Sequence, residues 1–257
     1  MLKKIIFLSV VFLLCLTGCS NKVKTVADIK SKGVITVITN AVFPPFEYFK
    51  LDEVKGIDVD IAKEVAKDLG VELEILDMNF DGVIAAIASG KGDFAAAGIT
   101  INEKRKKVID FSHEYITVPQ SLVTMADSKI NNVSDLKGKN IGTQIGTTSD
   151  TYIDNEIKDG FLKGSEAQVV KRKEYLDLVI DLKNGRLDVI ALDGLIARKL
   201  VEKNSRLKFF DRDSESYVLA VKKGNNELLK EINKTIDRLL KQGKIIDFYN
   251  QHINLNK

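Results

Sequence analysis

The chain has few of the residues on which metal and nucleophilic chemistry depend. Its 257 residues include two histidines, two cysteines, three prolines and no tryptophan. Neither His113 nor His252 lies in a pattern typical of a metal site, so we expect surface or capping roles for both. No G-x-S-x-G segment occurs, which argues against a serine hydrolase of the α/β type. The sequence therefore predicts no cofactor, no metal centre and no enzyme.

The apolar run Ile5–Leu16 is too short to cross a bilayer as a helix, which needs roughly 20 residues. It follows the basic segment Met1–Lys4, and this combination is typical of a secretory signal. The next residues, Leu16-Thr17-Gly18-Cys19, resemble a bacterial lipobox. We therefore expect residues 1–18 to be a lipoprotein signal peptide. The alternative is an ordinary signal peptide followed by an incidental cysteine.

Cysteine usage agrees with export. Cys15 would be removed with the signal peptide, which leaves Cys19 as the only thiol and excludes an intrachain disulfide. A lipobox implies that Cys19 is lipidated, with palmitate among the acyl chains, and more than one chain gives stable anchoring to a lipid bilayer. Residues 19–25 then form a polar tether. The predicted location is extracytoplasmic, lipid-anchored to the cell membrane.

The charge of the chain points to no particular partner. It carries 39 basic and 36 acidic residues, and removal of Lys3 and Lys4 with the signal leaves 37 against 36. Lys and Glu are interspersed, as they are on solvated helix surfaces. No basic stripe is present, so we expect no binding to nucleic acid.

Strand and helix signals alternate along the mature chain. Val34–Thr39 and Phe94–Ala97 are short apolar segments typical of buried strands, and Val71–Ile75 alternates with a period of two. Asp58–Leu69 and Asp81–Ser89 show helical spacing of their apolar residues. This order predicts an α/β fold with a mostly parallel sheet covered by helices on both faces.

One segment of the chain has a counterpart 95 residues later. Phe80–Phe94 and Tyr175–Val189 share an aromatic residue, an apolar triplet, a glycine, a basic residue and an aspartate in the same places. The sequence therefore predicts two lobes of similar design. Within each copy we expect the glycine, Gly90 or Gly185, to end a helix, and the aspartate, Asp93 or Asp188, to brace a turn.

Two extended segments can connect the lobes. Tyr115–Met125 contains Pro119, which suits an edge or linker strand, and Tyr217–Val221 is a second apolar strand. The helix predicted over Glu227–Gln242 then returns to the first lobe. Two crossing strands permit bending without unravelling either lobe. The expected division is residues 26–117 and 222–257 for lobe 1, and 118–221 for lobe 2 with the crossing strands.

Two segments have the chemistry of an anion site. Gly142–Thr148 places hydroxyls and backbone N–H groups before a helix expected near Ser149, capped by Thr148 or Ser149. Such a helix start suits a carboxylate. Gly98–Arg105 is the counterpart in lobe 1, where the glycine allows close approach and the arginine offers a planar pair of donors.

The chain resembles the bacterial extracellular solute-binding proteins of family 3, the polar amino-acid receptors of ABC importers. The matching motifs run in order through the mature chain: Asn40–Tyr48, Gly56–Asp60, Phe80–Gly82, Gly98–Ile101 with Arg105, Asp110–Ser112, Gly146–Thr148 and Leu192–Gly194. The resemblance implies a periplasmic-binding-protein-like type II fold, with two α/β lobes joined by a two-strand hinge. It also implies a monomer that binds one L-amino acid between the lobes and delivers it to a membrane permease.

The resemblance also implies roles for individual residues. It assigns the ligand α-carboxylate to Arg105, Thr100 and the backbone of Thr148, with Thr147 beside them. It assigns the α-ammonium to the Gly98 carbonyl and the Asp193 carboxylate, which occupy equivalent positions of the repeat. The ligand side chain is expected between Phe43 and Phe80, with Asn40 and Gln144 also in contact with it.

The preferred amino acid is less constrained. Asn40 and Gln144 are neutral amides, and with two phenyl rings they favour a neutral polar side chain such as that of glutamine. Glu47 supplies a negative charge that would suit arginine or lysine as the ligand. Cystine is a further candidate ligand.

Two other classes of function compete with a transport receptor. A cyclohexadienyl dehydratase-like enzyme on the same fold would need a general acid in the cleft, and Glu47 is the only evident extra candidate. A sensor module would need an output partner, and the sequence shows no further span or output domain. We therefore expect a receptor and not an enzyme.

Overall fold

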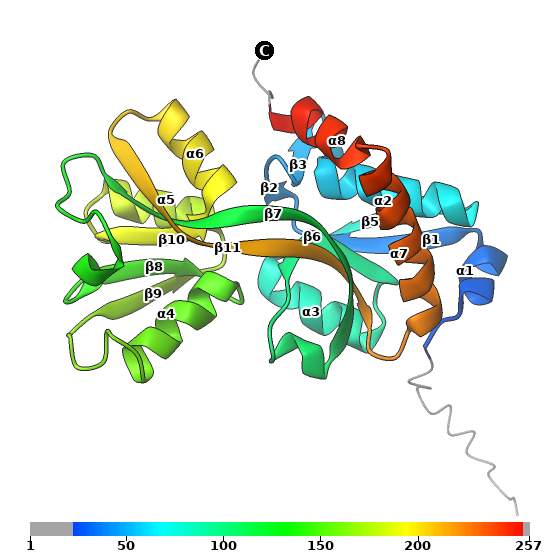
Figure 1. Cartoon of the computed structure of the whole chain (residues 1–257), viewed down its shortest axis with the longest axis horizontal. Helices are drawn as coiled ribbons and strands as arrows, with labels where there is room; N and C mark the ends of the chain where they lie inside the picture. Colours follow the sequence, from blue (N-terminus) through cyan, green and yellow to red (C-terminus); the bar gives the residue numbers. More distant parts are fainter. Residues whose placement is uncertain (1–22, 254–257) are drawn as a thin grey trace, which may run out of the picture.

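The structure, a computed structural model, describes residues 23–253 (Figure 1). The predicted signal peptide, residues 1–18, and the predicted lipidation site, Cys19, lie outside the described residues. Within them, no helix is both long and apolar enough to span a membrane.

The chain forms two α/β lobes joined by two long strands (Figure 1). The elements of lobe 1 are α1 (Val26–Lys32), β1 (Val34–Thr39), β2 (Val42–Phe43), β3 (Glu47–Lys50), β4 (Glu53–Lys55), α2 (Ile57–Leu69), β5 (Glu72–Asp77), α3 (Phe80–Ser89), β6 (Phe94–Thr100), the 3-10 turn η1 (Arg105–Lys107), α7 (Asn226–Lys241) and α8 (Lys244–Ile253). Lobe 2 contains η2 (Val133–Leu136), β8 (Asn140–Gln144), α4 (Thr148–Lys158), β9 (Gln168–Arg172), α5 (Tyr175–Lys183), β10 (Val189–Asp193) and α6 (Gly194–Lys203). The connecting strands are β7 (Ile109–Met125) and β11 (Leu207–Lys222).

One continuous sheet runs through both lobes, in the order β5-β1-β6-β11-β7-β10-β8-β9. The outer strands pair in parallel, as predicted, whereas β6, β11, β7 and β10 pair antiparallel. For Tyr115–Met125 the sequence allowed an edge or a linker strand, and the structure shows the linker, because β7 joins the lobes and lies between β11 and β10. Pro119 is accommodated next to a break in the pairing register between Asp211 and Ser214.

Each lobe buries apolar residues on both faces of its part of the sheet. In β6, Phe94 and Ala96 face one core with α2 and α7, while Ala95, Ala97 and Ile99 face a second core with α3. This alternation follows from the two-residue period of a strand. Lobe 2 has the same arrangement, with α5 and α6 over one face of its strands and α4 over the other. The prediction of helices on both faces is confirmed.

The two copies of the repeat have the same local contacts. Asp93 accepts a hydrogen bond from the backbone N–H of Thr36 at 2.8 Å, and Asp188 accepts one from the N–H of Asn140, also at 2.8 Å. Each aspartate thus ties its own strand to the neighbouring one. Gly90 caps α3 in a left-handed conformation, as predicted. In lobe 2 the helix ends earlier than predicted, with Asn184 as its cap and Gly185 left-handed after it.

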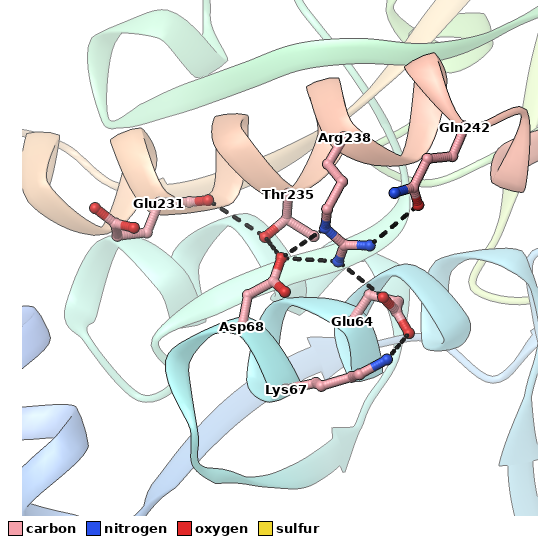
Figure 2. Close-up of polar contacts among 7 residues, drawn as sticks. All are labelled: Glu64, Lys67, Asp68, Glu231, Thr235, Arg238 and Gln242. Atoms are coloured by element: carbon pink, nitrogen blue, oxygen red, sulfur yellow. Dashed lines mark hydrogen bonds and ion pairs between the residues drawn. The ribbon is translucent and has the colours of Figure 1, made fainter.

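The returning helix α7 is bound to α2 by a polar cluster (Figure 2). Arg238 bonds Asp68 and Glu64, each at 2.8 Å, and Thr235 also donates to Asp68. Leu228, Ile232, Ile236 and Leu239 on the same helix enter the core beneath α2. The C-terminal helices therefore pack on lobe 1. The predicted division at residues 117/118 and 221/222 stays a prediction, because β7 and β11 run through it without interruption.

The two histidines have different environments. His113 is exposed and lies 2.7 Å from Asp237, as a surface role predicts. The same expectation is wrong for His252, which is 4% exposed. Its ring bonds the Asp60 carboxylate at 2.7 Å and the Tyr48 hydroxyl at 2.9 Å, so it fixes the end of α8 to lobe 1.

Candidate functional site

A pocket lies between the lobes and encloses about 390 Å³, its mouth included. Its lining contains every residue that the sequence predicted for ligand binding: Asn40, Phe43, Phe80, Gly98, Thr100, Arg105, Gln144, Thr147, Thr148 and Asp193. Glu47 and Ala97 complete it. The ends of β6, β8 and β10 meet here, as strand ends do at the ligand-binding edge of an α/β sheet.

Arg105 crosses the pocket from lobe 1 to lobe 2. It is 5% exposed, and its Nη1 donates to the carbonyl of Thr100 at 2.7 Å and to the hydroxyl at 3.1 Å. Nη2 donates to the carbonyl of Gly146 in lobe 2 at 2.9 Å. Its guanidinium also lies 5.6 Å from the ring centre of Phe80. Burial lowers the pKa of Arg105 to about 10, so the side chain keeps its charge at neutral pH.

The start of α4 differs by one residue from the prediction. Thr147 is the N-cap, not Thr148 or Ser149, because its backbone is extended and its hydroxyl accepts from the N–H of Asp150 at 3.1 Å. The helix therefore begins at Thr148 with its N-terminus at the pocket, where the backbone dipole favours an anion.

Two residues that the sequence did not single out hold this helix start. Glu215 of β11 accepts a hydrogen bond from the Thr148 hydroxyl at 2.6 Å. Gln120 of β7 accepts one from the Ser149 hydroxyl at 2.9 Å. Gln120 lies in the predicted connecting segment Tyr115–Met125, whereas Glu215 precedes the predicted segment Tyr217–Val221, so the sequence carried a signal for Gln120 alone. Both connecting strands thus reach into the site as well as joining the lobes.

Asp193 closes the other side of the pocket. Its Oδ1 accepts hydrogen bonds from the Tyr217 hydroxyl and, at 2.6 Å, from the Gln120 amide. Burial raises the pKa of Asp193 to about 6, and these two donors oppose that rise. An acceptor of this kind suits a ligand ammonium.

Gly98 is held by a carboxylate behind the pocket wall. Its backbone N–H donates to Asp58 at 2.9 Å, and the other oxygen of Asp58 accepts from the Tyr115 hydroxyl at 2.6 Å. Burial raises the pKa of Asp58 to about 6. The sequence placed Asp58 in the Gly56–Asp60 motif and gave it no role. Its position shows that it orients the strand end that carries Gly98.

The aromatic walls come from lobe 1 and reach lobe 2. Phe43 stacks on Phe46 with ring centres 5.8 Å apart and meets Tyr175 of lobe 2 edge-on at 6.5 Å. A sandwich of the ligand side chain between Phe43 and Phe80 stays a prediction.

Glu47 is the anomalous group of the pocket. It is 1% exposed, and its Oε2 has no hydrogen-bond partner. Burial raises the pKa of Glu47 well above its usual range, and the carboxylates of Asp58, Asp193 and Asp77 raise it further. Gln144 differs in that its amide already donates to the carbonyl of Lys173 at 2.9 Å.

Comparisons with known proteins agree with this geometry. The family description "Bacterial extracellular solute-binding proteins, family 3" matches residues 35–254. The chain is 30% identical to the arginine-binding extracellular protein ArtP of Bacillus subtilis, over 92% of the chain and 91% of ArtP. It is 33% identical to the ABC transporter glutamine-binding protein GlnH of the same organism, over 78% and 73%. The arginine-bound form of a truncated ArgBP from T. maritima is 40% identical, with a TM-score of 0.75 over 83% of this chain and 99% of that one. All three similar proteins are binding proteins of the periplasmic-binding-protein type II fold or its sequence family.

Proposed function

Since this chain belongs to the bacterial extracellular solute-binding proteins of family 3, we propose that it is the lipid-anchored receptor of an ABC importer and that it closes around one L-amino acid. Members of its family bind amino acids for ABC transporters. Delivery to a membrane permease, anchoring through Cys19 and a monomeric state are parts of this proposal.

The two sides of the pocket suit the two charged ends of an amino acid. Arg105 and the N-terminus of α4 would bind the α-carboxylate, with Thr100 and Thr147 alongside. Asp193 and the Gly98 carbonyl would bind the α-ammonium. Because the groups for each end come from both lobes, a ligand favours the closed arrangement over the open one. Charge-assisted hydrogen bonds of this kind contribute roughly 1.5–3 kcal/mol each.

The ligand side chain that the pocket supports best is cationic, with arginine first. The observation that carries this is the unpartnered oxygen of Glu47, since a buried acceptor without a donor is costly and a ligand cation would supply one. Arg105, Asp193 and Glu47 are the ionisable side chains of the lining, and with Glu47 ionised their net charge is −1, which a ligand with a net charge of +1 would neutralise. Arginine-binding relatives support the same assignment.

A second group of acidic residues from both lobes lies outside the pocket lining. Glu174 of lobe 2 is partly buried with an unpartnered oxygen. Burial raises the pKa of Glu174, and the carboxylates of Asp177, Asp77 and Asp81 raise it further. The last two belong to lobe 1, so closure brings acidic groups of both lobes together.

Glutamine, which the sequence favoured, is the second candidate. The amides of Asn40 and Gln144 line the pocket and suit a neutral polar side chain. A protonated Glu47 would donate to the glutamine carbonyl and would need no ligand charge.

A direct test separates the two candidates. Binding of the common amino acids is measured by thermal shift and then by titration calorimetry, on wild type and on Glu47→Gln. If the ligand is arginine, Glu47→Gln should weaken its binding roughly ten- to hundred-fold and leave glutamine binding within about two-fold. Glu53→Gln is the matched control, since Glu53 is exposed on β4 and pairs only with Lys55 at the surface. No shift with any amino acid would contradict the receptor itself.

An enzyme of the cyclohexadienyl dehydratase kind is the candidate from another class. The raised pKa of Glu47 in a closed pocket is the property that a general acid needs. The Arg105 and Asp193 clamp fits retention of an intact amino acid better. We expect no release of product from a cyclohexadienyl substrate over hours, and steady turnover would favour the enzyme.

A further inference from the structure

Tyr217 connects the two groups proposed to bind the ligand ammonium. A methyl group added to Gly98 of lobe 1 would lie 3.3 Å from the edge of the Tyr217 ring. The hydroxyl at the other end of the ring donates to Asp193 of lobe 2. One side chain therefore touches Gly98 and Asp193, although these residues belong to different lobes.

The ring of Tyr217 is fixed in lobe 1. It is fully buried and meets the ring of Phe46 edge-on, with centres 4.9 Å apart. Its backbone pairs with Thr100 at the end of β6. Tyr217 also stands next to a break in the pairing of β11 with β7, between Tyr217 and Val218. The side chain thus moves with lobe 1, while the strand loses regular pairing beside it.

The other donor to Asp193 is fixed in lobe 2. Gln120 lies directly opposite Asp193 in the pairing of β7 with β10, so its amide follows Asp193 in any movement of the lobes. Both donors reach the same oxygen, Oδ1. If the lobes separate, we therefore expect Asp193 to keep the bond from Gln120 and to lose the bond from Tyr217.

We propose that Tyr217 is a positioning residue for the ammonium end of the ligand, which completes the Asp193 acceptor only when the lobes are closed. Asp193 then binds the ligand ammonium most tightly when the lobes are closed, which is also when the Gly98 carbonyl faces the ammonium. The Tyr217 hydroxyl therefore couples the affinity for the ligand ammonium to closure of the lobes. The inference depends on the proposed amino-acid receptor and adds a residue to its mechanism.

The test compares two ligands that differ only in the α-amino group. Titration calorimetry measures L-arginine and 5-guanidinopentanoic acid on wild type and on Tyr217→Phe. The variant keeps the ring that packs on Phe46. We expect the affinity for L-arginine to fall on the order of ten-fold, as loss of a hydrogen bond to a charged group predicts. The affinity for the deaminated analogue should stay within about two-fold. If wild type binds glutamine more tightly, L-glutamine and glutaramic acid replace this pair.

Tyr48→Phe is the matched control. Tyr48 is also buried, and its hydroxyl bonds His252 within lobe 1. Its loss should leave the affinities for both ligands unchanged. Gln120→Leu gives a second arm, because it removes the other donor to the same oxygen. It also removes the acceptor of the Ser149 hydroxyl at the start of α4, so both ligands should weaken, and L-arginine more than the analogue.

The pH dependence of L-arginine binding supplies a second readout. It would not change if Tyr217 only packed against its neighbours. The charged groups around Asp193 are Glu47 on β3, Glu215 on β11 and Arg105 on η1, and its side-chain donors are Tyr217 and Gln120. Binding of L-arginine should weaken as the pH falls and Asp193 takes a proton. Tyr217→Phe should move that loss to higher pH, because a donor that stabilises the carboxylate is gone.

Two results would overturn the inference. One is an equal loss for both ligands in Tyr217→Phe, which would make the residue a general part of the hinge. The other is no selective effect in either Tyr217→Phe or Gln120→Leu. A wild type that binds no amino acid would instead overturn the proposed function.

Discussion

The two lobes hold their buried aspartates in the same way and use them differently. Asp58 of lobe 1 accepts from a tyrosine of β7, and Asp193 accepts from a tyrosine of β11. Burial raises the pKa of each to about 6. Asp58 lies behind the wall and binds the backbone of Gly98, whereas Asp193 itself lines the pocket.

The difference follows from the residues at equivalent strand ends. Gly98 and Asp193 occupy the same place in the repeat, after strands braced by Asp93 and Asp188. A glycine exposes its backbone to a ligand, and an aspartate presents a carboxylate. The same scaffold thus offers a neutral acceptor in one lobe and a charged one in the other. The predictions below test whether the lobes are alike in scaffold and unlike in chemistry.

The largest effect is expected at Arg105, which has no counterpart in lobe 2 among the lining residues. Arg105→Ala leaves the ligand carboxylate without its buried partner, and such a loss costs about 3–4 kcal/mol, or roughly two to three orders of magnitude in affinity. Titration calorimetry measures it. Lys106→Ala is the control, since Lys106 is exposed and pairs with Glu103 at the surface. A loss of less than about ten-fold in Arg105→Ala would remove this residue from the clamp.

The next effect compares the equivalent strand ends. Asp193→Asn keeps the shape of the acceptor and removes its charge, so we expect about a hundred-fold weaker binding. Gly98→Ala strains a backbone with φ of +55° and brings a methyl group 3.2 Å from the Phe43 ring. Its affinity should fall about ten-fold, with a loss of about 1–2 kcal/mol in stability. Equal effects on affinity at the two positions would contradict the difference in chemistry between the lobes.

A smaller effect is expected in how the stability of the ligand-free protein depends on pH. Asp58 and Asp193 have an ordinary pKa of 3.8 and a folded pKa of about 6. Because the folded state binds these protons more tightly, each carboxyl lowers stability above pH 6, by up to about 3 kcal/mol at pH 7. That cost disappears as the pH falls toward 3.8. The melting temperature should therefore rise from pH 7.5 to pH 5.5.

Single variants assign this pH effect to the lobes. Asp58→Asn and Asp193→Asn should each flatten the rise by a similar amount, since the pKa of each carboxyl is raised to about 6. Carboxylates with a lowered pKa, such as Asp110 beside Lys223, act in the opposite direction only at lower pH. A melting temperature that falls between pH 7.5 and 5.5 would show that these two carboxyls do not dominate.

The smallest effect tests the shared scaffold alone. Gly90 and Gly185 are left-handed at the same point of the repeat, with φ of +81° and +70°. Gly90→Ala and Gly185→Ala should each cost about 1 kcal/mol of stability, because alanine avoids that region. Thermal unfolding measures both, and the affinity for the amino acid should not change. A cost in only one lobe would show that the repeat is not structurally equivalent.

Much of the fold and of the site could be predicted, because local sequence patterns determine the helices, the strands and the residues at their ends. Val34–Thr39 is a strand with the predicted bounds, and the helix predicted over Asp58–Leu69 begins one residue earlier. All ten predicted site residues line one pocket, since strand ends in such folds converge. The cap of α4 and the burial of His252 were missed, because a run of threonines offers several caps and a histidine near a chain end does not reveal its partners.

The sequence by itself determined which elements form, where the repeat lies and which residues end the strands that bear the clamp, because these depend on local periodicity and on residue types at fixed spacing. Only the tertiary structure decided that β7 is internal to the sheet and that Gln120 and Tyr217 meet on one oxygen of Asp193. It alone left Oε2 of Glu47 buried without a hydrogen-bond partner. Those properties arise when segments distant in the sequence pack together and exclude water; Tyr217 and Asp193 are 24 residues apart, and Gln120 and Asp193 are 73 apart. The neighbours of a carboxylate in space then determine whether it is solvated, hydrogen-bonded or buried without a partner.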